Sequence, residues 1–149
     1  MAKFHGSIAA FKIDDAGGTL RDISANVDDL SLSRKFDTPD VTGQGQSAPA
    51  VKSFIVGLGE ADISIKGTWD TTSNTGTATV GAALANAGGQ LTAGGSLSFE
   101  VHPGGTATGT PKRTGECYMT AYDESAPVNG RVSFSAQFKV TGAITNGTN

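Results

Sequence analysis

The residue types most often used in catalysis and metal binding are sparse and far apart in this sequence. The two histidines are His5, near the amino terminus, and His102, directly before Pro103, and the single cysteine is Cys117. Acid–base and nucleophilic mechanisms need such groups within hydrogen-bonding distance of one another, and a zinc site needs Cys or His pairs at short spacing. The sequence offers neither arrangement, so we predict no catalytic residue and no metal ligand.

Cys117 and the paired aspartates have simpler structural explanations. Cys117 alternates with Met119 and Ala121 along a predicted strand, which is typical of a small buried hydrophobic residue and not of a nucleophile. The aspartate pairs at residues 14–15 and 28–29 lack the spaced ligands of a calcium loop. We expect these carboxylates to be solvated at turns and strand ends.

Three short motifs match known signatures only in part. GQGQSA at residues 43–48 has glycines spaced like part of a dinucleotide-binding turn, but no predicted strand leads into it and no helix follows. TGTPKR at residues 108–113 lacks the Gly-Lys-Ser/Thr ending of a phosphate-binding loop. NGT at residues 146–148 matches a glycosylation triplet but lacks a secretion signal. We therefore predict that the protein binds no cofactor and is not an enzyme.

Composition and charge argue against several classes of partner. The chain has 149 residues, a formal net charge of -3 and an isoelectric point near 5.2. This balance provides no general attraction to nucleic acid or to an anionic membrane surface. A single cysteine allows no intrachain disulfide, and the first residues lack the apolar stretch of a signal peptide. We expect the protein to be made in the cytoplasm.

Alternation of apolar and polar residues with period two predicts that most of the chain forms β-strands. The clearest case is residues 61–69, where apolar residues at odd positions alternate with polar or charged ones. The other predicted strands are residues 8–13, 20–23, 27–36, 96–101, 116–122 and 131–140. The residues of the last strand expected to face the core are Val132, Phe134, Ala136, Phe138 and Val140.

A change of period predicts one short helix at residues 77–87. Val80, Leu84 and Ala87 are spaced for one helical face, threonines precede them as caps, and two glycines follow as a stop. The predicted fold class is therefore mainly β, an antiparallel β-sandwich or partial barrel with one short flanking α-helix. We expect a single domain over residues 1–149 that ends in a short polar tail.

Residues 37–53 (DTPDVTGQGQSAPAVKS) are predicted to form a long exposed loop. The segment contains two prolines and two glycines and cannot bury enough apolar surface to fold alone. A loop of this length in a compact domain commonly has a function, and we predict that it mediates assembly. The residues expected to do so are Asp37, Thr38, Asp40, Thr42, Gln44, Gln46 and Lys52.

Three segments occur in an order that matches a known family. DDAGG after the first strand leads to LRDISANVDDLSLSRKFDTPDVTG, and KSFIVGLGEADISIKGTWD then supplies a Gly-Leu step and an alternating strand. The chain closes with GECYMTAYDESAPVNGRVSFSAQFKVTGAI, a hairpin whose last strand finishes on Val-Thr-Gly. Over almost its whole length the sequence resembles the tail tube proteins, or major tail proteins, of long-tailed bacteriophages.

The resemblance implies a structural protein of the virion, made in the cytoplasm of a bacterial host. It implies that six copies close into a ring whose inner strands form a continuous barrel, and that the rings stack into a tail tube. DNA would pass through the lumen as transient cargo. The loop at residues 37–53 would order against an adjacent subunit or ring, and other phage structural proteins would be further partners.

Two other functions stay open on the sequence alone. A capsid decoration protein of the same fold would use the same strands and loop to bind the outer surface of a shell. A carbohydrate-binding β-sandwich would need clustered exposed aromatic residues. Tyr118 and Tyr122 are the candidates for such a pair, because Trp69 is expected to face inward.

Overall fold

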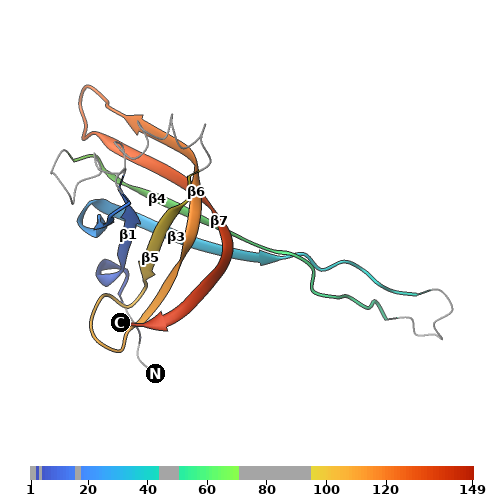
Figure 1. The fold of residues 1–149 in the computed structure, drawn as a ribbon. Helices are drawn as coiled ribbons and strands as arrows, with labels where there is room; N and C mark the ends of the chain where they lie inside the picture. Colours follow the sequence, from blue (N-terminus) through green and yellow to red (C-terminus); the bar gives the residue numbers. More distant parts are fainter. Residues whose placement is uncertain (1–2, 4, 16–17, 44–50, 71–94) are drawn as a thin grey trace.

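The protein is described by a computed structural model that covers residues 3, 5–15, 18–43, 51–70 and 95–149 (Figure 1). Its strands form one antiparallel sheet of seven strands in the order β2-β1-β5-β6-β7-β4-β3. The strands are β1 (Ala10–Asp14), β2 (Leu20–Asp22), β3 (Val27–Phe36), β4 (Gly59–Thr68), β5 (Leu97–His102), β6 (Pro111–Ser125) and β7 (Ser133–Thr148). Two 3-10 turns, η1 (Gly6–Ile8) and η2 (Ser24–Asn26), flank β1 and β3. The helix predicted at residues 77–87 lies outside the described residues.

The sheet curls over its own inner face. Phe11 of β1 and Phe138 of β7 pack with ring centroids 6.2 Å apart, although β5 and β6 separate the two strands in the sheet. The buried side chains around them come from five strands and from Ile23, which directly precedes η2. They are Ile13, Ile23, Ile63, Ile65, Leu97, Phe99, Val101, Cys117, Met119, Phe134 and Ala136. Burial of this apolar surface is the main force that holds the sheet curled. The mainly β, antiparallel fold class is confirmed.

The alternating pattern of β3 and β4 forms the strands that it predicts. Both strands span the expected residues to within two positions, and Ile63 and Ile65 are buried in the core. Gly67 lies so close to η2 that a Cβ atom there would be 1.8 Å from the carbonyl oxygen of Asn26. The absence of a side chain at Gly67 is therefore what lets η2 pack against β4.

β6 and β7 extend beyond their predicted residues, β6 at both of its ends and β7 at its carboxyl end. Pro111 pairs with Thr148, so residues 111–115, ahead of the predicted strand, are strand, and the expected polar tail is the end of β7. These residues show little apolar alternation because backbone pairing holds most of them in the sheet. Asn149 closes the chain by donating its backbone N–H to the carbonyl oxygen of Thr110, 3.0 Å away.

Candidate assembly surfaces

Of the three side chains singled out for possible chemistry, His102 and Cys117 are buried, and His5 is exposed with its Nδ1 2.8 Å from Oγ of Ser7. His102 is buried with its Nε2 3.1 Å from Oε2 of Glu100. Cys117 is buried, as predicted, and its burial, together with the nearby carboxylates of Glu116 and Asp14, raises the pKa of the thiol to about 12. Among the described residues, no group of three His, Cys, Asp or Glu side chains could hold a metal ion.

The aspartate pairs bind groups of the chain itself. Asp15 accepts hydrogen bonds from the Thr19 backbone N–H at 2.9 Å and from Nε of Arg21 at 2.8 Å, which fixes the β1–β2 turn. Asp28 at the start of β3 forms an ion pair with Arg131. These contacts give the aspartates a structural role.

No helix in the described part of the chain has the length and apolar character needed to cross a membrane.

The loop predicted to mediate assembly is a two-stranded extension of β3 and β4. We call its described residues, 37–43 and 51–58, the arm; Figure 1 shows it projecting far from the sheet. Backbone hydrogen bonds join the two segments from Asp37 N–H to the Leu58 oxygen at 3.0 Å, and from Val41 N–H to the Ser53 oxygen at 2.8 Å. The arm is thus an ordered ribbon, held together by its own backbone.

The structure places the predicted assembly residues on this arm. Those within the described residues are Asp37, Thr38, Asp40, Thr42 and Lys52, and all of them are exposed. Gln44 and Gln46 lie outside the described residues. Asp40 has an internal role, since the Thr42 backbone N–H donates to its Oδ1 at 2.9 Å. The hydrogen bonds from Thr42 hold the pKa of the Asp40 carboxyl below its ordinary value.

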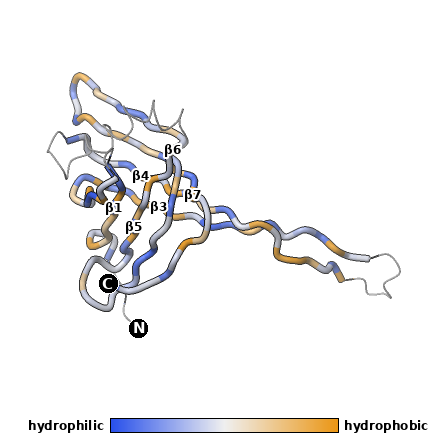
Figure 2. Tube along the Cα trace, in the orientation of Figure 1, coloured by the Kyte–Doolittle hydropathy of each residue, from blue (hydrophilic) through white to orange (hydrophobic). Residues whose placement is uncertain are grey.

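The arm also carries exposed apolar residues that our sequence prediction missed. Val56 is 74% exposed and Leu58 is 83% exposed, although buried sites are usual for such side chains. The other large hydrophobic residues exposed on the arm and at its base are Phe36, Val41, Val51, Phe54 and Ile55. Figure 2 shows hydrophobic stretches along the arm. These apolar residues lie in the predicted exposed loop or within a few positions of it. That clustering in the sequence could have indicated an interface, because a concentrated exposed apolar surface marks one.

The outer face of β3, β4, β7 and β6 is polar. Its described residues, which we call the polar face, are Asp29, Ser31, Ser33 and Lys35 of β3, Glu60, Asp62, Ser64, Lys66 and Thr68 of β4, Ser133, Ser135, Gln137 and Lys139 of β7, and Asp123 and Ser125 of β6. Lys139 bridges Glu60 at 2.7 Å and Asp62 at 3.0 Å. Hydrogen bonds to these two carboxylates raise the pKa of Lys139.

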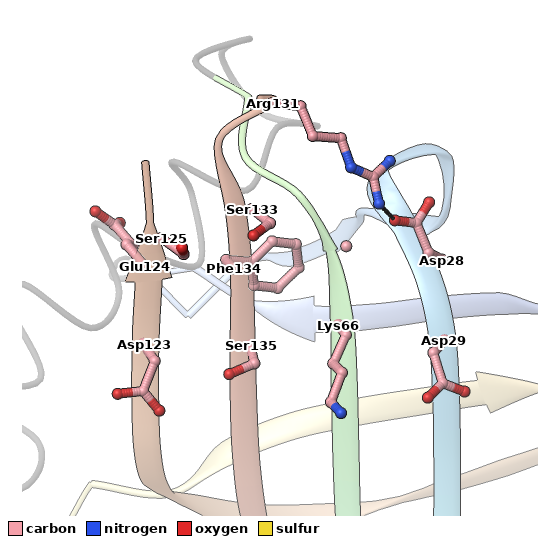
Figure 3. A pocket seen from close by; sticks show the side chains of 11 residues that line it. Asp28, Asp29, Lys66, Asp123, Glu124, Ser125, Arg131, Ser133, Phe134 and Ser135 are labelled. Carbon is pink, nitrogen blue, oxygen red and sulfur yellow. Dashed lines mark hydrogen bonds and ion pairs between the residues drawn. The ribbon is translucent and has the colours of Figure 1, made fainter. Parts of the chain in front are cut away.

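One row of side chains crosses the polar face from edge to edge. Asp29, Lys66, Ser135 and Asp123 occupy paired positions on four successive strands, and Figure 3 shows them side by side. The row lies in a shallow hollow of about 470 Å³ whose rim includes Arg131. Its carboxylates and hydroxyls present a hydrated, weakly acidic surface without a built ligand site.

Two long strand edges have no partner among the described strands. β3 ends the sheet, so its ten residues are paired on one side only, with β4. β5 pairs with β6 only as far as Cys117. The outer edge of β6 at residues 118–125 therefore has no described strand beside it. Open edges of this length are templates for pairing with another chain.

The two tyrosines do not form the exposed pair that a sugar-binding surface would need. Tyr118 is exposed, whereas Tyr122 packs against the core and stacks on Phe134 with ring centroids 6.2 Å apart. A register shift between Met119 and Ala121 is the cause, because the extra residue of a β-bulge turns the following side chains to the other face. Trp69 is partly buried against the core, and its indole N–H donates to Glu124 at 3.0 Å.

Comparison with solved structures finds chains of similar fold at low sequence identity. The tail of an empty gene transfer agent particle, refined with C6 symmetry, superposes with a TM-score of 0.73 and 20% identity, covering 96% of this chain and 98% of that one. The SPP1 tail tube superposes with a TM-score of 0.71 and 12% identity, covering 99% of this chain and 80% of that one. The chain has the fold of a tail tube protein.

Similar folds also occur outside tailed phages. A chain from the extended sheath-tube complex of an extracellular contractile injection system gives a TM-score of 0.65 at 8% identity, covering 99% of this chain and 93% of that one. No protein-family model and no curated protein sequence matches the chain. The similarity to tail tube proteins is therefore seen in the three-dimensional structure and in the resemblance of the sequence.

Proposed function

We propose that this protein is a structural subunit of a phage-like tail tube, without catalytic activity, located in the virion after synthesis in the host cytoplasm. Copies close into rings, six to a ring as in the C6-symmetric tail that the fold resembles, and the rings stack into a tube that conducts DNA. The observation that carries the proposal is the match of fold over nearly the full length of both chains. The open strand edges, the polar face and the arm supply the contacts and the channel lining that such an assembly needs.

The open edges supply the contact within a ring. β3 and β6 run in opposite directions, because each neighbouring pair between them is antiparallel. The β3 edge of one copy can therefore continue the antiparallel pattern along the β6 edge of the next copy. The two edges differ, so the contact is head-to-tail, and such contacts form rings when the rotation between copies closes.

The polar face supplies the lining of the channel. Edge pairing in a ring continues the sheet of β3, β4, β7 and β6 from copy to copy, which leaves the polar face on one side of a closed wall. Its serines keep the wall hydrated, and its acidic residues outnumber Lys35, Lys66 and Lys139. DNA phosphates are repelled by net negative charge, so DNA would move along this wall without adhering to it.

The arm supplies the contact between rings. It projects well beyond the sheet and exposes apolar side chains that only another molecule can cover. We expect deletion of residues 43–49 to preserve the circular dichroism of the monomer and to abolish tubes. Tubes that form normally without this segment would remove the arm from the proposal.

Negative-stain electron microscopy of the purified protein over a concentration series tests the whole function. We expect rings or tubes that become more numerous as concentration rises. Monomers that persist at every concentration would contradict self-assembly and would direct the search toward a capsid shell as partner. No observation in the structure favours capsid decoration over the tube.

A further inference from the structure

A crevice with both apolar and charged walls opens at the root of the arm. β4 pairs with β7 only as far as Asp62 and Lys139, and β7 then turns away from the arm (Figure 1). Gly142 lies within this departure with a positive φ of 74°, a conformation that glycine adopts without strain. The divergence of the strands leaves a space of about 350 Å³ beside the arm. We call this space the root crevice.

The walls of the root crevice combine apolar and charged side chains. Its apolar residues are Phe36, Ala61, Val140, Ala143 and Ile144, and its charged residues are Arg34 and Glu60. The Glu60 carboxylate is already paired with Lys139 at 2.7 Å. Val140 and Ile144 also pack against the hydrophobic core, so the floor of the crevice is continuous with it. A cavity of roughly 150 Å³ accommodates a benzene ring. The root crevice thus has room for a phenyl ring and part of a second side chain.

The positively charged side chain of Arg34 lies on the wall of this crevice and has no carboxylate partner among the described residues. Arg34 lines the crevice, and its one described side-chain hydrogen bond goes to the neutral Oδ1 of Asn146 at 3.3 Å. None of the ion pairs between described residues includes Arg34. An occupant with an apolar side chain next to a carboxylate would match both features of the site.

The arm carries that combination. Phe54 is exposed and forms an isolated antiparallel bridge with Asp40, so the phenyl ring and the carboxylate come from directly opposite positions of the ribbon. Val56 lies two residues further along and shares the side of Phe54 in an extended chain. The arm of the same copy starts at the crevice and points away from it, so it does not fold back into the space.

We propose that the root crevice of one copy receives Phe54 and Val56 from the arm of a second copy, with Asp40 of that arm beside Arg34. The inference rests on the proposed stacking of rings and names the acceptor for the arm. In this arrangement the base of each arm binds the arm of another copy, so that the same contact repeats from ring to ring.

Disulfide trapping in mixed assemblies tests this contact. Phe54→Cys chains are mixed with Ala143→Cys chains, assembled, and oxidised under mild conditions, and non-reducing gels show whether linked dimers form. Val128→Cys is the matched control for Ala143→Cys, because Val128 is fully exposed in the turn between β6 and β7. The native Cys117 is buried and is not expected to contribute.

We expect tubes in which the 54–143 pair is linked and the 54–128 pair is not. Tubes without the 54–143 link, or with equal linkage of both pairs, would overturn the crevice as acceptor and leave the tube function standing. Failure of the unmodified protein to form rings or tubes would overturn the tube function and the crevice inference together.

A charge reversal tests the polar part of the contact. We expect Arg34→Glu to raise the concentration at which tubes appear about tenfold or more, since buried charge pairs at interfaces are sensitive to loss of one partner. Lys3→Glu is the control, because it makes the same change of charge on an exposed residue that belongs to none of the three proposed assembly surfaces. Equal thresholds for the two variants would count against a pairing of Arg34 with the arm.

Discussion

The two ends of the β3–β4 pair follow the same backbone pattern but differ in how their apolar residues are covered. Over the sheet, Ile63 and Ile65 are buried at 1% and 0% exposure. Along the arm, Val56 and Leu58 remain 74% and 83% exposed. One continuous ribbon therefore buries its apolar residues in the core at one end and leaves them exposed at the other.

Because of this difference, we expect the stability of the fold and its assembly to depend on different halves of the ribbon. Changes on the sheet half should lower the free energy of unfolding, because cavities and clashes in a packed core are not relieved by solvent. Changes on the arm half should leave unfolding nearly unchanged and should act on assembly.

The largest expected effect is on the core phenylalanines. Phe138→Ala should reduce the free energy of unfolding by roughly 3 to 5 kcal/mol, because a large buried side chain is lost and the cavity collapses only in part. Phe54→Ala on the arm should change it by less than about 0.5 kcal/mol. Urea denaturation of the monomeric proteins measures both values. Similar losses for the two variants would refute the division between body and arm.

A smaller effect is expected from alanine in place of two glycines. Gly67→Ala should cost roughly 1 to 3 kcal/mol, since the new Cβ would clash with the carbonyl oxygen of Asn26 and push η2 away from β4. Gly43→Ala on the arm has open space around it and should be close to neutral. Thermal and urea unfolding compare the pair. A neutral Gly67→Ala would mean that η2 does not pack tightly on β4.

The smallest expected effect concerns pH and the arm. Because hydrogen bonds from Thr42 lower the pKa of Asp40 below 3.8, the local contact is fully formed above that pH and is lost as pH falls through the lowered value. The protection factor of the Thr42 amide, which compares its exchange rate measured by NMR with the intrinsic rate at the same pH, should therefore fall on acidification. Asp40→Asn should remove most of this pH dependence, while Asp37→Asn should retain it. An unchanged profile in Asp40→Asn would assign the effect to another group.

The sequence predicted those strands in which apolar and polar residues alternate against a packed core. β3 and β4 were predicted almost residue for residue, because Leu30, Ile63 and Ile65 repeat every second position toward the core. The ends of β6 and β7 could not be predicted in this way. Residues 141–148 hold their strand mainly through backbone pairing. One apolar residue, Ile144, packs against the core, but no alternating pattern distinguishes the segment from a polar tail.

The role of residues 37–53 in assembly stays a prediction. The described residues of this segment, 37–43 and 51–53, are exposed, yet attention to their polarity missed Phe54, Val56 and Leu58 just beyond it. The face of Tyr122 was also missed, since a β-bulge changes the count of residues along a strand without leaving a mark in the composition. Both errors arise where local pattern and three-dimensional pairing differ.

The narrow attachment of the arm has a mechanical consequence. Two chain segments join it to the sheet, and few backbone hydrogen bonds hold them together. A coupling of this kind should resist separation of two rings more strongly than it resists tilting of one against the other. We expect a tube with such couplings at every level to behave as a column of stiff discs on compliant joints, which bends along a curved path while its bore keeps a constant width.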